Sequence, residues 1–257
     1  MLAELIPQTF FEHITADWLL WLFGGGAIVL LVVGADRAVA SAVRLARAMG
    51  MSKVVVGATV VSLGTTSPEA FTSVTAAFQG DPGLALGNGV GSIICDTTLV
   101  LGTALLLRRL PRNRFVLYRQ GLLKVGAEAT LIGVLLLLAA LRGALTGVVL
   151  FRWIGVLFVV GLAGYMAFSV RWARKHPEIV AGADDVPDRA TTPAAAVLHL
   201  AVLLLGLGLV VLGANVLVGA VHELSSRYGV PEDVLAVSVV ALGTSLPEFV
   251  TAIASVL

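Results

Sequence analysis

Two glutamates occupy unusual places in the chain, because each follows a proline inside a long apolar stretch. The dipeptides are Pro68–Glu69 and Pro247–Glu248. A carboxylate at the centre of a bilayer costs about 2.5–3.5 kcal/mol on insertion scales, so two such carboxylates call for a functional reason. Proline has no backbone N–H and leaves a carbonyl about one turn earlier without its helical partner. Each position therefore offers a carboxylate beside a freed carbonyl oxygen.

Hydroxyl side chains stand just before both glutamates, in GTTSPE at 64–69 and GTSLPE at 243–248. The hydroxyl residues are Thr65, Thr66, Thr244 and Ser245. The freed carbonyls belong to Gly64 and Gly243, or to near neighbours such as Ser62 and Ala241. Carboxylate, hydroxyl and carbonyl oxygens are hard donors, which suit Na⁺ and Ca²⁺ better than soft metals. The pattern predicts a cation site.

A third polar element is the stretch GNGVGSIICD at 87–96. Its small residues allow another helix to approach closely. Ser92 and Asp96 are four residues apart and share one helix face, so Asp96 is a third deep carboxylate. By contrast, the four histidines (His13, His176, His199 and His222) show no ligand-type spacing in the sequence, and we expect no metal site from them.

The two glutamate motifs belong to an internal repeat with an offset of 179 residues. Residues 34–78 align without gaps with 213–257, and 14 of the 45 positions are identical. Identities among apolar residues carry little weight. The shared Gly-Thr-x-x-Pro-Glu carries more, since proline and glutamate are rare inside membrane spans.

The elements that position these residues are predicted to be membrane helices. The chain of 257 residues is 58% hydrophobic and only 13% charged, with a mean hydropathy of +0.98, whereas soluble domains are about 25% charged. A span needs about 20 apolar residues. Seven stretches qualify: 18–36, 54–78, 84–107, 121–141, 147–170, 197–221 and 233–257. We therefore expect an all-α polytopic membrane protein.

Basic residues orient these spans. Of the 17 Lys and Arg residues, 14 follow the first, third and fifth spans, and cytoplasmic connections are enriched in such residues. The N-terminus is therefore expected outside and the stretch 173–196 inside. The two repeats then cross the membrane in opposite directions, as in secondary transporters built from inverted repeats.

The duplicated motif resembles the alpha-repeats of the cation/calcium exchanger superfamily, closest in pattern to prokaryotic sodium/calcium exchangers. Each family repeat has Gly-Thr-Ser-x-Pro-Glu followed by Gly-Asn-x-x-Gly-Ser-x-x-x-Asn/Asp, and here both segments of the first copy and the first segment of the second are present. The family fold has ten spans in two inverted halves. The resemblance implies that 1–172 is the first five-helix repeat, 173–196 a cytoplasmic loop and 197–257 an incomplete second repeat.

The resemblance also implies roles for single residues. Glu69 and Glu248 correspond to the central carboxylates that bind Ca²⁺ and Na⁺. The residues that correspond to Na⁺ ligands, carbonyl donors or the polar site of the third span are Thr65, Thr66, Thr244, Ser245, Ser92, Ser62, Ala241 and Asp96. Two departures from the family pattern are Asp96, which is often Asn, and Thr66, which replaces Ser.

The function implied is secondary active antiport of Ca²⁺ against Na⁺ by alternating access, in the plasma membrane of a prokaryote. The alternatives are an H⁺/Ca²⁺ antiporter of the same superfamily and a non-transporting half-protein. An intramembrane enzyme is disfavoured, because the chain has no HExxH motif and no nucleophile–base pairing. We expect membrane lipid and the transported ions as partners, with no cofactor, catalytic residue or nucleic acid.

The repeat offset carries one further expectation. Shifting Ser92 and Asp96 by 179 gives positions 271 and 275, beyond Leu257. We therefore expect about seven of the family's ten spans here, and a natural continuation of the chain that supplies a second Gly-Asn-x-x-Gly segment.

Overall fold

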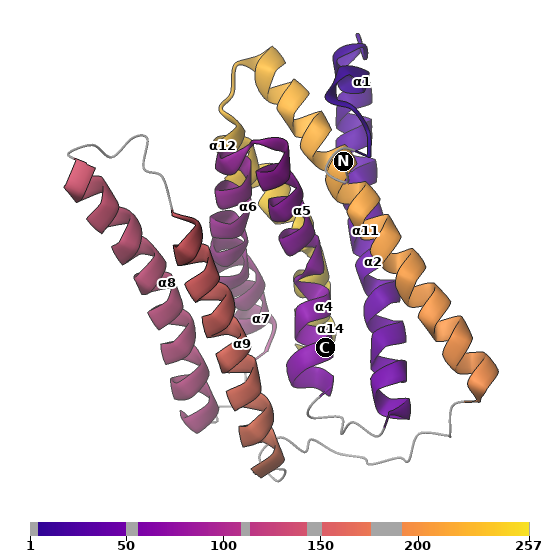
Figure 1. Cartoon of the computed structure of the whole chain (residues 1–257), viewed down its shortest axis with the longest axis vertical. Helices are drawn as coiled ribbons and strands as arrows, with labels where there is room; N and C mark the ends of the chain where they lie inside the picture. Colours follow the sequence, from indigo (N-terminus) through magenta and orange to yellow (C-terminus); the bar gives the residue numbers. More distant parts are fainter. Residues whose placement is uncertain (1–4, 50–55, 109–113, 143–150, 176–191, 257) are drawn as a thin grey trace. The chain divides into compact units, whose positions relative to one another are not determined.

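The computed structural model describes residues 5–49, 56–108, 114–142, 151–175 and 192–256. Within these ranges every regular element is a helix (Figure 1), which confirms the predicted all-α fold. The chain forms two compact units, unit 1 with Met1–Arg108 and Ala173–Leu257, and unit 2 with Arg109–Trp172. The candidate site residues all lie in unit 1. Most of the predicted cytoplasmic loop 173–196 lies outside the described residues.

Unit 1 contains two long helices and three that are assembled from shorter pieces. The long helices are α2 (Asp17–Ala48) and α11 (Pro193–Tyr228), and α1 (Gln8–Glu12) precedes them. A first interrupted helix consists of η1 (Gly57–Val61), α4 (Ser62–Thr65) and α5 (Ser67–Gln79). A continuous helix follows, made of α6 (Pro82–Cys95), η2 (Asp96–Val100) and α7 (Leu101–Leu107). A second interrupted helix consists of α12 (Glu232–Leu235), η3 (Ala236–Val240), α13 (Ala241–Thr244) and α14 (Leu246–Val256).

The long helices α2 and α11 pack closely because glycines remove side chains from their contact. A Cβ added to Gly34 would lie 2.7 Å from the carbonyl oxygen of Gly206, and one added to Gly213 would lie 2.9 Å from that of Ala27. Residue numbers therefore rise along α2 as they fall along α11. The two helices run antiparallel, as Figure 1 also shows. This is the relation that an inverted repeat predicts for its two first helices.

Both long helices continue past the predicted spans 18–36 and 197–221. The 32 residues of α2 extend about 48 Å at about 1.5 Å per residue, more than the hydrocarbon thickness of about 30 Å. The charges of Asp36 and Arg37 suggested an end to the first span. Instead Arg37, Arg44 and Arg47 lie on the second half of the helix, so the helix continues beyond the predicted span.

Within the described ranges, four helical stretches are long and apolar enough to cross a membrane: Asp17–Ala48, Pro82–Leu107, Gly121–Leu141 and Pro193–Tyr228. They coincide with four of the seven predicted spans. The apolar stretch of α9 is shorter, at Arg152–Phe168. The remaining two predicted spans, 54–78 and 233–257, correspond to the interrupted helices of unit 1.

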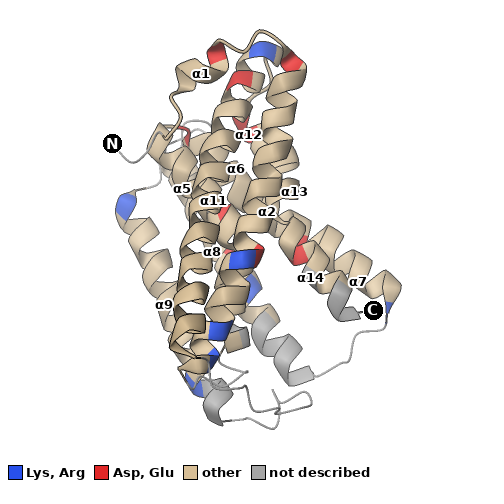
Figure 2. Ribbon diagram, turned by 90° about the vertical axis from the view of Figure 1, so that its right-hand side faces the viewer, with Lys and Arg blue, Asp and Glu red and all other residues tan. Residues whose placement is uncertain are grey.

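Five of the acidic residues described in unit 1 lie at one of its ends, and we call it the acidic end. It comprises Asp17, Asp81, Glu223, Glu232 and Asp233, together with Arg227. Figure 2 shows red segments of the ribbon, which mark acidic residues, gathered beside α1 and α12. Arg227 pairs with Glu223 at 2.6 Å and with Asp17 at 2.8 Å, which joins the end of α11 to the start of α2.

Unit 2 consists of α8 (Arg114–Arg142) and α9 (Arg152–Lys175). Leu136, Leu137, Val159 and Val160 are each more than half exposed. Apolar side chains presented outward in this way suit a lipid environment.

Candidate cation site

The two interrupted helices share one local structure at an offset of 179 residues. Each contains a π-helical turn, at 57–61 and 236–240, and each breaks at a single residue, Thr66 or Ser245. The backbone angles at the two breaks are nearly equal, with φ −80° and ψ 3° at Thr66 and φ −82° and ψ 6° at Ser245. The alignment of the repeat is therefore reproduced in the backbone residue by residue.

The prolines explain where the helices restart. Pro68 and Pro247 are the second residues of α5 and α14, a position at which a missing N–H costs no helical hydrogen bond. In the first copy the Ser67 hydroxyl donates to the carbonyl oxygen of Gly64 at 2.7 Å. As a result each glutamate stands in the first turn of a helix, next to its positive end, where negative charge is stabilised.

Each glutamate accepts a hydrogen bond from the hydroxyl residue at the helix break of the other repeat copy. The Ser245 hydroxyl donates to Oε1 of Glu69 at 3.0 Å, and the Thr66 hydroxyl donates to Oε1 of Glu248 at 3.3 Å. Because 66 and 245, and 69 and 248, are equivalent in the repeat, the two hydrogen bonds are related by its approximate two-fold symmetry. The other oxygen, Oε2, of each glutamate is buried without a hydrogen-bond partner among the described residues.

Asp96 brings a third negative charge to the same place. It is the first residue of η2, which packs against α14, and it is half-buried. Its charge acts on those of both Glu69 and Glu248. In the part of the chain that the structure describes, no ion pair involves either glutamate. A cation placed among the carboxylates would relieve this repulsion.

Asn88 links the two copies from the middle of α6 and is completely buried. Its Nδ2 donates to the backbone oxygen of Glu69 at 3.2 Å and to the Ser73 hydroxyl at 2.9 Å. Its Oδ1 accepts a hydrogen bond from Thr244 at 3.2 Å. The sequence analysis assigned Asn88 no role, although an amide among the glycines of a membrane span is the signal that could have identified it.

The glycines beside Asn88 let α6 lie against the second copy. A Cβ on Gly87 would lie 2.9 Å from the carbonyl oxygen of Asp233, and one on Gly91 would lie 2.5 Å from that of Val237. Any side chain at either position would push α6 away from η3. Close helix packing, which the sequence suggested for Gly87 and Gly91, is thus observed.

The remaining predicted site residues fall around this centre. Thr65 is half-buried, and its hydroxyl interacts with the Glu248 carboxylate. Ser92 is buried on α6, and its Oγ has no hydrogen-bond partner among the described residues. The carbonyl of Ala241 accepts hydrogen bonds from Thr244 Oγ1 at 3.3 Å and Ser245 N at 3.0 Å. Ser62 begins α4, and its side chain lies outside the described residues.

This geometry can hold a hard cation. Carboxylate oxygens from Glu69 and Glu248, hydroxyl oxygens from both breaks and the charge of Asp96 converge where two helices begin. Oxygen-only donors of this type bind Na⁺ and Ca²⁺. The breaks also resemble the discontinuous helices that place ion sites near the midplane of secondary transporters. Fold and site together define an inverted-repeat membrane protein of the ion-transporter class.

Comparison with known proteins agrees with this class. The family model of the sodium/calcium exchanger proteins matches residues 18–171 and 198–257. The putative antiporter CaxA of Alkalimonas amylolytica is 31% identical over 234 residues, which cover 90% of this chain and 69% of that protein. The sodium/calcium exchanger MaX1 of Methanosarcina acetivorans is 39% identical over 108 residues, or 42% of this chain and 30% of that protein.

A solved structure gives the same result. It is that of the sodium-calcium exchanger NCX_Mj soaked with Na⁺ and Sr²⁺, with a TM-score of 0.50 and 28% identity over 94% of this chain and 73% of that one. The chain belongs to the sodium/calcium exchanger family, which confirms the resemblance seen in the sequence. It is accordingly an integral membrane protein of a family of cation antiporters, which are transporters and not enzymes in the usual sense.

Proposed function

We propose that the protein exchanges Ca²⁺ for Na⁺ across the membrane, at a site formed by Glu69 and Glu248. The observation that carries this proposal is the reciprocal pair of hydrogen bonds, from Ser245 to Glu69 and from Thr66 to Glu248. Each copy of the repeat thereby donates a hydrogen bond to the carboxylate of the other copy. The similarity to proteins named sodium/calcium exchanger and antiporter supports the choice of ions.

Charge balance provides the coupling in this proposal. Deep carboxylates without a counter-charge are costly in a membrane interior. One Ca²⁺ or several Na⁺ ions can supply the missing positive charge. The site then changes its exposure from one side to the other only when loaded, so the flow of one ion is tied to the flow of the other without any chemical reaction.

The proposed ligands divide by chemistry. The carboxylates of Glu69 and Glu248 take the divalent ion, because their charge matches it best. Na⁺ uses the hydroxyl and carbonyl oxygens around the carboxylates. The residues assigned this second role are Thr65, Thr66, Thr244, Ser245, Ser92, Ser62 and Ala241. Asp96 adds negative charge or carries a proton.

Position relative to the membrane is also part of the proposal. Arg44 and Arg47 lie near the end of α2 opposite the acidic end of unit 1. Because cytoplasmic connections are rich in basic residues, we place that end inside and the acidic end, with the N-terminus, outside. The membrane is the plasma membrane of a prokaryotic cell.

The experiment that tests the proposal is Ca²⁺ uptake into vesicles holding the natural full-length protein, with Na⁺ and H⁺ gradients imposed in turn. An outward Na⁺ gradient is expected to drive uptake, and a proton gradient alone is not. Uptake driven by the proton gradient alone would replace Na⁺ by H⁺ as the coupling ion. Absence of uptake under both gradients would reject Ca²⁺ antiport.

A further inference from the structure

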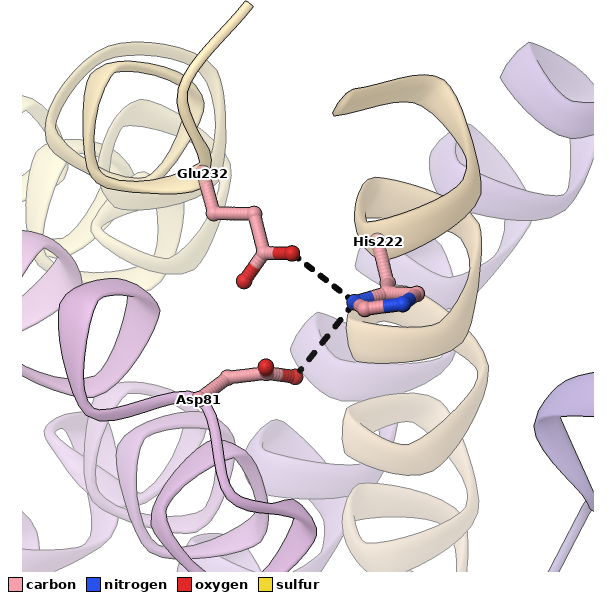
Figure 3. A group of neighbouring side chains, drawn as sticks. All are labelled: Asp81, His222 and Glu232. Atoms are coloured by element: carbon pink, nitrogen blue, oxygen red, sulfur yellow. Dashed lines mark ion pairs between the residues drawn. The ribbon is translucent and has the colours of Figure 1, made fainter. Parts of the chain in front are cut away.

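Three ionisable side chains from separate parts of unit 1 meet at its acidic end. Figure 3 shows His222 of α11 pointing towards Asp81, which precedes α6, and Glu232, which begins α12. This cluster is distinct from the carboxylates of the candidate cation site. No metal site was predicted for His222, because the four histidines of the sequence show no ligand-type spacing.

The imidazole stands between the two carboxylates. Nδ1 of His222 lies 2.8 Å from Oε1 of Glu232 and 3.8 Å from Oδ2 of Asp81. The side chains are partly covered, with exposed fractions of 39% for His222, 13% for Asp81 and 25% for Glu232. With His222 protonated, the 2.8 Å contact is an ion pair and the 3.8 Å contact a longer one. Nδ1 of His222 and Oδ2 of Asp81 are both buried without a hydrogen-bond partner among the described residues.

The three side chains are also placed closely enough to share a metal ion. One ligand atom from each residue can be chosen so that all three lie within 4.8 Å of one another. Zinc bonds to imidazole nitrogen and carboxylate oxygen are about 2.0–2.2 Å long, so the ligands of a tetrahedral site lie about 3.4 Å apart. The observed 2.8 Å and 3.8 Å lie on either side of this spacing, and small side-chain rotations would equalise them.

The donor set indicates which metal would bind. Imidazole suits Zn²⁺ and related transition metals, whereas Ca²⁺ takes oxygen ligands. We propose that Asp81, His222 and Glu232 form a binding site for a divalent transition metal of the Zn²⁺ class, separate from Glu69 and Glu248. Water fills the remaining coordination positions, since His222 and Glu232 reach solvent.

A metal held here would join three separate elements of unit 1. His222 belongs to α11, and the two acids stand at the starts of α6 and α12. Bound metal therefore fastens α11 to the two helices that meet next to Gly87. A ligand that binds only the folded arrangement stabilises it by mass action, so metal raises the unfolding temperature of the protein.

The test is calorimetric titration of the purified full-length protein with Zn²⁺, in the presence of excess Na⁺ and Ca²⁺ to occupy the cation site. We expect one Zn²⁺ per chain and a higher midpoint of thermal unfolding. His222→Ala should weaken Zn²⁺ binding at least about tenfold, since even groups that only support a ligand contribute about 10–100-fold to metal affinity. Asp81→Asn, which keeps the shape but removes the charge, should also weaken it.

The matched control is His199→Ala, which removes a second histidine from α11 at a position away from the cluster. This variant should bind Zn²⁺ as the parent does. Unchanged Zn²⁺ affinity in both His222→Ala and Asp81→Asn would overturn the proposal, as would loss of Zn²⁺ binding in Glu69→Gln instead. The titration needs no ion gradient, so its failure is distinguishable from a failure of the proposed Ca²⁺ exchange.

Discussion

The two interrupted helices have the same backbone conformation, but their site residues differ in how deeply they are buried. Both have the π-helical turn, the break and the glutamate in the first turn of the restarted helix. Yet Glu69 is 6% exposed, while Glu248 is only half-buried. The hydroxyl residues differ in the same way, since Ser245 is 1% exposed and Thr66 is exposed.

Among the residues present here, α6 covers the pair of Ser245 and Glu69, whereas the positions equivalent to α6 in the second copy, shifted by 179, fall after Leu257. Helix α6 packs against α5 of the first copy and against η3 and α13 of the second. It carries Asn88, which holds the backbone of Glu69 and the side chain of Thr244. The pair Ser245–Glu69 is therefore enclosed, and the pair Thr66–Glu248 is the more open one. A duplicated motif thus fixes which groups meet, while the neighbouring helix decides how strongly each pair is shielded from solvent.

The largest effect is expected from removing either carboxylate charge. Glu69→Gln and Glu248→Gln should each lower Ca²⁺ affinity by at least about thirtyfold, because removing one partner of a buried charge interaction costs about 2–5 kcal/mol. Flux of Ca²⁺ under a Na⁺ gradient should fall to background while membrane insertion persists. The enclosed Glu69 should be the less tolerant of the two. Near-normal flux in both variants would reject the assignment of the site.

A smaller and unequal effect is expected from the two hydroxyls. Ser245→Ala leaves a buried carboxylate oxygen without its donor, which costs about 1–3 kcal/mol. Thr66→Val removes the equivalent donor at a less enclosed position. Ion affinity should therefore fall more in Ser245→Ala than in Thr66→Val when Ca²⁺ binding is measured side by side. The reverse order would contradict the enclosed and open assignment.

Asn88 should matter for stability more than for charge. Asn88→Ala removes three hydrogen bonds and leaves Thr244 and Ser73 without that partner. Loss of a buried partner costs about 1–3 kcal/mol, which thermal unfolding in detergent would show as a lower midpoint. Asn88→Ala with the parent's midpoint would mean that α6 is held by glycine packing alone.

Asp96→Asn tests the role of the third carboxylate. An amide keeps the shape but cannot take up a proton, so exchange should persist and become less sensitive to acid pH. Ca²⁺ flux measured across a pH series provides the check. Complete loss of flux in Asp96→Asn would instead make Asp96 a required ligand.

The inverted relation of α2 and α11 predicts labelling from opposite sides. Met49 and Tyr228 are exposed at the ends of these antiparallel helices. In a background lacking Cys95, Met49→Cys should react with a membrane-impermeant thiol reagent from the inside and Tyr228→Cys from the outside. Reaction of both from one side would contradict the proposed orientation.

Much of this architecture could be predicted from the sequence, because the repeat fixes it. The offset of 179 anticipated the matching breaks, and the Pro-Glu pairs marked the restarted helices. The far ends of α2 and α11 could not be predicted, since charged residues such as Arg44 and Arg47 are equally compatible with a loop and with a helix that leaves the membrane. The roles of Asn88 and His222 depend on partners far away in the chain, and periodicity does not show such partners.

Competition between the two ions tests the central claim most directly. Ca²⁺ binding to the purified full-length protein would be measured at equilibrium as Na⁺ is added. The account predicts that Na⁺ displaces Ca²⁺ with a slope steeper than one-for-one competition, and that Glu69→Gln and Glu248→Gln each abolish the competed Ca²⁺ site. Ca²⁺ binding that is unaffected by Na⁺, or that persists in both variants, would contradict this prediction.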